Sequence, residues 1–215
     1  MANVVTAIKQ QKRNPQRVNI YLDGHFAFPL AKILGAWLQV GQSLSPGKIQ
    51  ELKGQDEVEL ALQRALNFLS YRPRSQNEVE RNLRKHEIPE ELIPAVIERL
   101  KSGHWLNDLD FARCWIEDRG ASRPRGAFAL RAELRLKGIA DEIIGQALDG
   151  LQEEELARRA AQRKLRQLKG LDWPQFRNKL SAHLSRRGFG YELVAEVCRA
   201  TWEGQLDVET QKETR

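Results

Sequence analysis

The apolar residues of this chain follow two different patterns, and the first occupies about fifty residues. There they are β-branched or alternate with polar residues, as in VVTAIK (4–9) and RVNIYLDGHFAFPL (17–30). Alternation is typical of strands, and Asp23-Gly24 supplies the positive φ angles of a tight hairpin turn. The pattern predicts strands near 4–9, 18–22 and 25–29, a short helix over 30–38, and a further helix from about residue 46.

From residue 58 onward, the apolar residues recur at spacings of three and four, which is the helix period. Three stretches resemble one another: LRKHEIPEEL (83–92), LRLKGIADEI (134–143) and LSRRGFGYEL (184–193). Matching apolar positions are offset by 51 and then 50 residues. A repeat at fixed period indicates a tandem array whose units stack on their neighbours.

Each unit contains three predicted helices with a tight turn between the second and the third. Gly138 and Gly188 occupy the position where a left-handed residue ends the second helix. The first unit has Glu87 there, so its turn is expected to be strained or differently formed. Pro94 is expected to loosen or kink the helix that contains it. The predicted helices are 58–70, 75–86 and 89–102, then 107–119, 124–137 and 140–150, then 153–168, 174–187 and 190–202.

The predicted fold is therefore mainly α-helical, with three tandem three-helix units preceded by a small N-terminal β-hairpin and helix. The expected divisions are 1–53, 58–104, 105–152, 153–203 and a polar, frayed tail over 204–215.

The net charge of +6 is unevenly distributed. Residues 1–53 hold 7 basic and 2 acidic side chains, and residues 153–203 hold 11 and 7, whereas 58–104 (8 and 7) and 105–152 (7 and 8) are close to neutral. An elongated molecule of this kind could meet a polyanion or an acidic partner at both ends. The alternative for any single Lys or Arg is a solvated helix surface.

The sequence offers no catalytic constellation. Its four histidines are scattered, and it contains neither a phosphate-binding glycine loop nor His and Cys at metal-ligand spacing. We therefore expect a binding protein without catalytic residues, metal or cofactor. Cys114 and Cys198 are expected to be reduced packing residues. No apolar run approaches the roughly 18 residues of a membrane helix, and the N-terminus lacks an apolar signal core, so a cytoplasmic protein is expected.

Arg-Pro-Arg occurs twice just before a predicted helix start, in YRPRS (71–75) and RGASRPRG (119–126). Pro stiffens each joint, and Pro124 fits the first turn of its helix, so the arginines project from a defined place. Arginine there could bind phosphate or carboxylate bidentately, although a solvated turn is the alternative. The aromatic residues favour core packing over base stacking: Trp105, Phe111 and Trp115 near the second unit, and Trp173, Phe176 and Trp202 in the third.

These residues together resemble the RecX family, the bacterial regulators of the RecA recombinase. The resemblance rests on ALNFLSYRPRSQNEVERNLRKHEIPEELI (65–93), WLNDLDFARCWIEDR (105–119) and RPRGAFALRAELRLKGI (123–139), and it covers 58–202. The N-terminal hairpin region is similar to an extension that only part of the family carries.

The resemblance implies a curved, modular, monomeric protein that binds in the groove of the RecA–single-stranded-DNA filament. It implies modulation, usually inhibition, of strand exchange, ATP hydrolysis and co-protease activity in homologous recombination, DNA repair and the SOS response, with weak binding to single-stranded DNA alone. The alternatives are a sequence-independent DNA-binding protein acting without RecA, and a purely structural helical adaptor. The candidate contacts are Arg72, Arg74, Arg113, Arg119, Arg123, Arg125, Arg163, Arg166, Lys169, Arg186 and Arg187.

Overall fold

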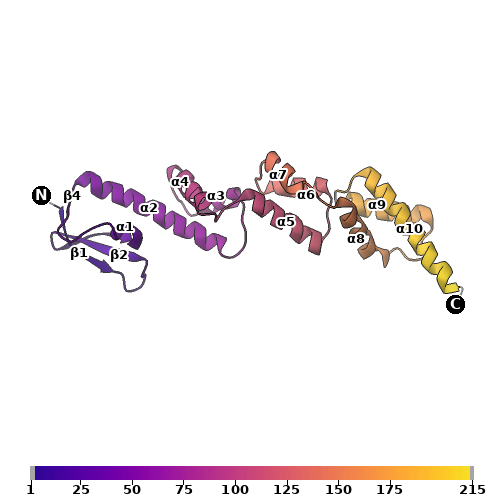
Figure 1. Cartoon of the computed structure of the whole chain (residues 1–215), viewed down its shortest axis with the longest axis horizontal. Coiled ribbons are helices and arrows are strands. Elements are labelled where there is room, and N and C mark those ends of the chain that lie inside the picture. Colours follow the sequence, from indigo (N-terminus) through magenta and orange to yellow (C-terminus); the bar gives the residue numbers. More distant parts are fainter. Residues whose placement is uncertain (1–2, 214–215) are drawn as a thin grey trace. The chain divides into compact units, whose positions relative to one another are not determined.

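The computed structural model describes residues 3–213, and the side chains of residues 3–204 (Figure 1). The chain forms two compact units. The first ends at Leu106, and the second begins at Asn107 and also includes the short segment Ser75–Asn77. Residues 214–215 of the predicted polar tail lie outside the described part.

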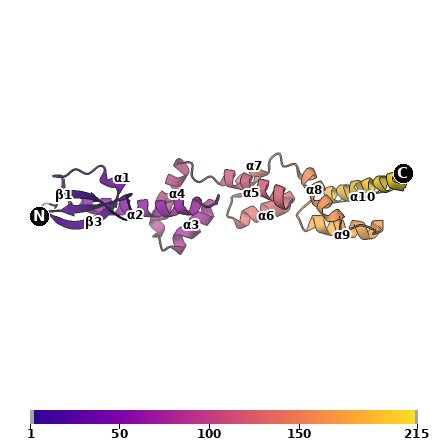
Figure 2. The same cartoon turned by 90° about the horizontal axis from the view of Figure 1, so that it is seen from below.

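The N-terminal segment contains a β-sheet (Figure 2). The sheet has four antiparallel strands in the order β3-β2-β1-β4. The three predicted strands are confirmed, whereas β4 pairs with β1 and was not predicted. Both residues of the turn between β2 and β3 have positive φ, 50° at Asp23 and 87° at Gly24, as the hairpin prediction requires. The elements are β1 (Asn3–Gln10), β2 (Arg17–Leu22), β3 (His25–Ala31), the short helix α1 (Lys32–Gly35) and β4 (Ser43–Leu44).

Helix α2 (Pro46–Leu69) belongs to two cores. Ser45 caps its start by accepting a hydrogen bond from Lys48 N at 3.1 Å. Leu52 packs with the apolar side chains of the sheet, whereas Ala61 and Ala65 pack in the core of the following helices. The helix is continuous through residues 54–57. The predicted boundary between 1–53 and 58–104 therefore lies within one helix, between the part that packs on the sheet and the part that packs on the following helices.

Three groups of helices follow, and each buries the same positions of the repeated pattern. Among the described side chains, each group has its own cluster of buried apolar residues. The elements are α3 (Gln76–Lys85), the 3-10 turn η1 (Glu90–Leu92) and α4 (Ile93–Ser102); α5 (Asp108–Ser122), α6 (Ala127–Leu136) and α7 (Asp141–Leu148); and α8 (Glu153–Leu165), α9 (Trp173–Ser185) and α10 (Tyr191–Glu213). The matched and buried positions include Val79, Leu130 and Leu180; Leu83, Leu134 and Leu184; and Ile93, Ile144 and Val194.

The turn after the second helix is the same in all three groups. Glu87, Gly138 and Gly188 have φ of 58°, 79° and 83°. The amide of the residue that follows each of them returns to a carbonyl of the preceding helix: Ile88 to Leu83 at 3.2 Å, Ile139 to Leu134 at 3.1 Å and Phe189 to Leu184 at 3.3 Å. Of the two outcomes expected at Glu87, the structure has the strained one: the residue is left-handed like the two glycines, at the energetic cost of a Cβ in that region.

The two prolines fare differently. The predicted helix over 89–102 is divided into the 3-10 turn Glu90–Leu92 and α4, and Pro94 lies in the first turn of α4, where its missing N–H is tolerated. Pro124 precedes α6, whose N-cap is Gly126, so it lies in an extended joint outside the helix.

Three other expectations also need correction. Helix α10 runs to Glu213 instead of ending near 202, because the tail contains helix-forming residues and no proline. Cys114 is exposed, and only Cys198 is a packing residue. Trp105 is 63% exposed and anchors no core, whereas Trp173, Phe176 and Trp202 form the expected cluster, with ring centroids 5.1–6.3 Å apart.

Candidate nucleic-acid interface

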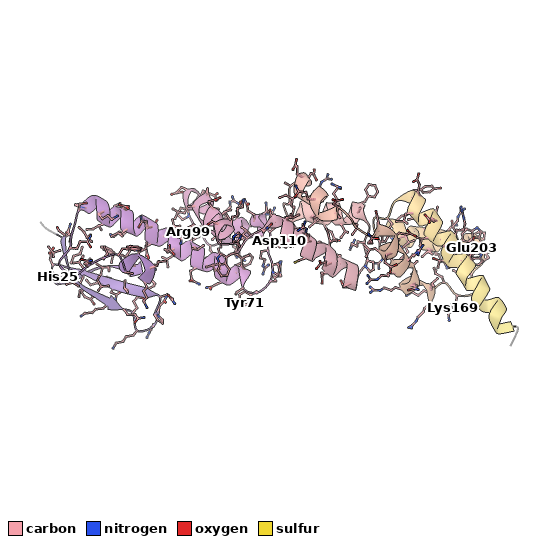
Figure 3. The ribbon with its side chains drawn as sticks, in the orientation of Figure 1. His25, Tyr71, Arg99, Asp110, Lys169 and Glu203 are labelled. Carbon is pink, nitrogen blue, oxygen red and sulfur yellow. The ribbon has the colours of Figure 1, made fainter. Side chains whose placement is uncertain are left out.

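The first Arg-Pro-Arg joint follows α2, next to Tyr71 (Figure 3), and its arginines are engaged locally. Arg72 forms an ion pair with Glu78 at 3.1 Å and donates to Pro73 O at 2.9 Å. The Arg74 guanidinium lies 4.0 Å from the ring centroid of Phe68, a cation–π contact. Burial, followed by the charge of Arg72, lowers the pKa of Arg74. The two arginines of this joint are therefore held by contacts close to them in the sequence, whereas Ser75 at its end donates to Lys137 O at 2.7 Å.

The second joint is tied to α6 by one carboxylate. Glu133 accepts hydrogen bonds from Arg119 Nε and Trp115 Nε1, both at 2.8 Å, and Arg125 Nε lies 2.7 Å from its other oxygen. Burial opposes ionisation of Glu133, but these hydrogen bonds and the charges of Arg125 and Arg119 outweigh it, so its pKa lies below the ordinary value. The Arg119 guanidinium also lies 4.3 Å from the Trp115 ring centroid, which makes Trp115 a support for this joint.

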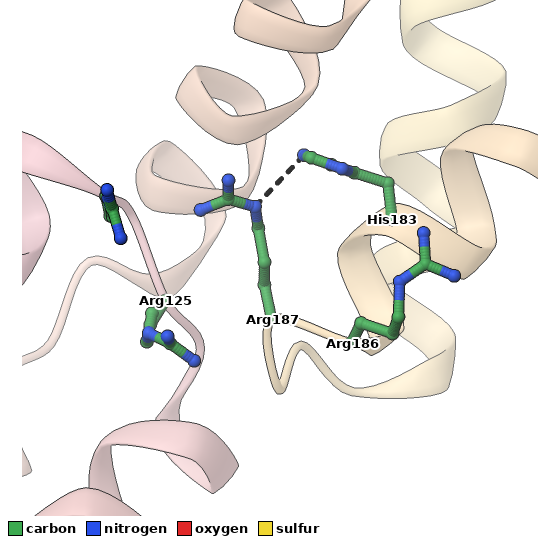
Figure 4. Close-up of a pocket in the computed structure, with 5 residues that line it drawn as sticks. Arg125, His183, Arg186 and Arg187 are labelled. Atoms are coloured by element: carbon green, nitrogen blue, oxygen red, sulfur yellow. Dashed lines mark hydrogen bonds between the residues drawn. The ribbon is translucent and has the colours of Figure 1, made fainter.

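The second joint meets the third group of helices at a pocket of about 300 Å³ that only basic side chains line (Figure 4). We call this the cationic pocket. Arg125 comes from the joint before α6. Arg187 comes from the turn after α9, and its side chain reaches that joint at Pro124. The structure thus brings together four of the predicted residues and adds a histidine. The lining residues are Arg123, Arg125, His183, Arg186 and Arg187.

Backbone contacts hold the two sides of the pocket together. Gly126 N donates to Arg187 O at 2.9 Å, directly joining the two turns. A Cβ at Gly188 would lie 2.5 Å from Ala129 Cβ, so only glycine permits this approach. Ala127 N, at the start of α6, donates to Glu153 Oε1 at 2.9 Å. The pocket therefore has a defined backbone geometry within the second unit.

Arg187 is held by neutral acceptors. Its Nε donates to His183 Nε2 at 3.0 Å, and its Nη1 donates to Pro124 O at 3.1 Å. Burial, and then the charges of Arg125, Arg163 and Arg123, lower the pKa of Arg187. A carbonyl and an imidazole orient the guanidinium without cancelling its charge, so the pocket stays positive.

His183 is one of the four scattered histidines of the sequence, and its place in the pocket was missed. The pKa of His183 is lowered, first by burial and then by the charges of Arg187, Lys164 and Arg186. A hydrogen bond to the Ala160 backbone raises the pKa but does not outweigh these effects. The ring is therefore neutral near neutral pH, which leaves Nε2 able to accept from Arg187. Its position four residues before Arg187, one turn back on α9, was the available signal.

A second basic pocket lies along α8. It has a volume of about 450 Å³ and is lined by Arg159, Gln162, Arg163 and Arg166. Arg163 donates to Ala121 O at 2.9 Å and also to Ser122 O, carbonyls in the last turn of α5. Arg163 therefore fixes α8 to the helix that precedes the cationic pocket.

Five of the predicted residues line neither pocket: Arg72, Arg74 and Arg119 make the contacts described above, and Arg113 and Lys169 remain. Arg113 is exposed on α5, and Lys169 is exposed in the turn after α8 (Figure 3). Among the described side chains, those of residues 3–204, no group of three or more His, Cys, Asp or Glu could hold a metal ion. No helix in the described part of the chain has the length and apolar character needed to cross a membrane.

The chemistry of the cationic pocket suits phosphate. Arginine presents several N–H donors in a planar fork that matches phosphate oxygens. Arg125 shares its charge with Glu133, whereas Arg187 donates only to neutral acceptors in the described part of the chain. The fold and the pocket together define a helical-repeat protein with a concentrated positive surface.

Comparisons with known proteins narrow this class, and the chain belongs to the RecX family of regulatory proteins. Four family models match it: the Regulatory protein RecX N-terminal domain over 3–45, and the first, second and third RecX three-helix domains over 61–100, 107–148 and 152–198. The match therefore extends beyond residues 58–202, on which the sequence resemblance rested.

Relatives and solved structures agree with this assignment. Proteins named Regulatory protein RecX from Bacillus pumilus (strain SAFR-032) and Bacillus subtilis (strain 168) are each 35% identical to it, over 94% and 97% of this chain and 78% and 81% of theirs. A crystal structure of regulatory protein RecX matches with a TM-score of 0.79 at 26% identity, over 92% of this chain and 98% of that one. RecX from Lactobacillus salivarius matches with a TM-score of 0.63 at 26% identity, over 68% and 97%.

Proposed function

We propose that this chain is a regulator of the RecA recombinase that binds the RecA–single-stranded-DNA filament in its groove and inhibits it. In this proposal it acts as a cytoplasmic monomer without catalytic activity of its own, and strand exchange, ATP hydrolysis and co-protease activity decrease together. The observation that carries the proposal is the family match, which spans all four segments of the chain.

The proposal assigns the filament contacts to the tandem units. Separate apolar clusters support a division into 1–53, 58–104, 105–152 and 153–203, because each cluster can keep its own packing while the units meet different protomers. Several weak contacts on neighbouring protomers would add by avidity. The cationic pocket is the part of this surface that we assign to the DNA within the filament.

A titration of the full chain into RecA, ATP and single-stranded DNA tests the proposal, with ATP hydrolysis as the readout. We expect hydrolysis to fall as the chain is added. A pocket variant, R123Q/R186Q, should inhibit less than a control variant, R177Q/K179Q, which loses the same charge from exposed positions of α9. Unchanged hydrolysis at a saturating amount of the folded wild-type chain would contradict the proposal.

A second candidate function is sequence-independent DNA binding without RecA, and the cationic pocket is the observation that favours it. Such binding is dominated by phosphate contacts and weakens steeply with salt. A DNA-alone titration in a salt series separates the candidates. Tight, salt-sensitive binding beside unchanged RecA hydrolysis would favour the second function over the first.

A further inference from the structure

Two exposed aromatic side chains lie within four residues, along the chain, of arginines that line the cationic pocket. Phe128 is 72% exposed in the first turn of α6, three residues after Arg125, and Tyr191 is 86% exposed at the start of α10, four residues after Arg187. A Cβ at Gly190 would lie 3.9 Å from Phe128 Cε2, so the ring of Phe128 lies over the turn that leads into Tyr191.

These two rings are not required by the core. The core of the second helix group contains Phe111, and that of the third contains Phe176, and both are buried. Phe128 and Tyr191 instead face solvent at the starts of α6 and α10. Exposed aromatic rings beside a concentrated charge suggest a ligand that has both an apolar face and an anionic group.

We propose that the contact between segments 123–129 and 186–191 is a binding site for single-stranded nucleic acid. The phosphate backbone occupies the cationic pocket, and unpaired bases stack on Phe128 and Tyr191. This inference deepens the proposed function and rests on it for its setting, a filament that holds single-stranded DNA.

The chemistry of the site distinguishes this ligand from other polyanions. Base–aromatic stacking needs bases with free faces, which a duplex does not offer, and it tolerates any sequence. Arginine forks grip phosphates along the backbone without reading bases. An acidic peptide would use the arginines but would gain nothing specific from two exposed rings.

The backbone geometry supports a prearranged site. Gly126 N donates to Arg187 O, and Gly188 packs directly on Ala129, so the two segments that carry the arginines and the rings are held together before a ligand arrives. A site ordered in advance loses less conformational entropy on binding.

The test is binding of the full chain to a fluorescein-labelled oligo-dT, measured by fluorescence anisotropy over a salt series without RecA. The pocket variant R123Q/R186Q should flatten the plot of log affinity against log salt by about 1.4, which is about 0.7 for each phosphate that the variant no longer neutralises. The ring variant F128L/Y191L should weaken binding by at least about fivefold per ring and leave the salt slope unchanged.

Matched controls remove the same chemistry elsewhere. R177Q/K179Q removes two exposed charges from α9, and Y71L removes an exposed ring from the first unit. Both should bind like the wild type. Thermal melting of every variant confirms folding, and the conservative ring variant F128Y/Y191F should restore affinity because it keeps both stacking faces.

Two results would overturn the inference: a ring variant that binds like the wild type, or a charge control that flattens the salt slope as much as the pocket variant. The inference would also be overturned if the chain bound a duplex of the same length as tightly as oligo-dT. The same holds if poly-glutamate displaced the labelled oligo-dT as well as unlabelled oligo-dT does. If the inference fails while the wild type still lowers RecA hydrolysis, the proposed function stands. If wild-type RecA hydrolysis is unchanged while the variants behave as expected, only the proposed function fails.

Discussion

Gly188 controls the geometry of the contact between the second and third helix groups. Its φ of 83° is left-handed, and an added Cβ would lie 2.5 Å from Ala129 Cβ and 2.9 Å from Ala129 Cα. The substitution Gly188→Ala therefore meets two obstacles, a strained backbone and a clash with the first turn of α6. A substitution at Gly150 distinguishes the strain from the clash, because Gly150 also has a left-handed φ, 73°, but no atom lies within 4 Å of an added Cβ.

The expected magnitudes follow from these two effects. A left-handed alanine costs about 1–2 kcal/mol, which Gly150→Ala measures alone. Overpacking adds about 1–3 kcal/mol at Gly188, because the obstructing atoms are backbone and Cβ atoms that cannot rotate away. The destabilisation caused by Gly188→Ala should therefore exceed that caused by Gly150→Ala by about 1–3 kcal/mol. This difference corresponds to roughly 5- to 150-fold in a local opening equilibrium.

The assay is amide hydrogen exchange read at Gly126, whose N–H donates to Arg187 O at 2.9 Å. Because exchange of this amide requires the two turns to separate, its rate reports opening of the contact. We expect Gly188→Ala to accelerate exchange at Gly126, whereas Gly150→Ala should leave it near the wild-type rate. Unchanged exchange in Gly188→Ala, or equal acceleration in the two variants, would refute the role of the close approach.

Three further predictions concern side chains. Asp56→Ala leaves the half-buried Arg17 without its bidentate partner and should lower the free energy of unfolding of the N-terminal segment by about 3–5 kcal/mol, measured by urea denaturation. Glu133→Gln should lower the melting temperature of the second unit yet tighten oligo-dT binding in the anisotropy assay, because it releases the two arginines that it pairs; weaker binding would count against their proposed role. The lowered pKa of His183 means that the unfolded chain binds its proton first. Stability of the second unit should therefore be fully present above about pH 6.5 and fall as the pH drops below that value. His183→Gln should reduce this fall in a series of melting temperatures, and an identical pH profile would exclude the assignment.

The helical repeat was predictable because its signals are local. Positions such as Val79, Leu130 and Leu180 recur at helix spacing, and the turn residue that follows shares one left-handed conformation even where Glu87 replaces glycine. The hydrogen bond that closes the turn joins backbone groups five residues apart, so a short stretch of sequence contains everything that determines it. Strand β4 was missed because two residues cannot show an alternating pattern.

The cationic pocket was only partly predictable because it joins segments about sixty residues apart. Arg123 and Arg125 belong to a segment in which acidic and basic residues nearly balance, so counts along the chain hide their contribution. Their partner carboxylate and the approach of Arg187 depend on tertiary packing. Sequence reasoning could name the correct arginines, but nothing local groups four of them together or adds His183.

The choice of hydrogen-bond acceptor separates the arginines that stabilise the fold from those that can meet a polyanion. Arg17 and Arg135 pair with aspartates, which cancel their charge. Arg163 and Arg187 instead donate to backbone carbonyls and to a neutral imidazole, which orient the guanidinium and leave its charge intact. Like charges at this density destabilise one another, and this repulsion adds to burial in lowering the pKa of Arg187. A bound phosphate would relieve the repulsion, so the repulsion in the free chain becomes part of the free energy that favours binding.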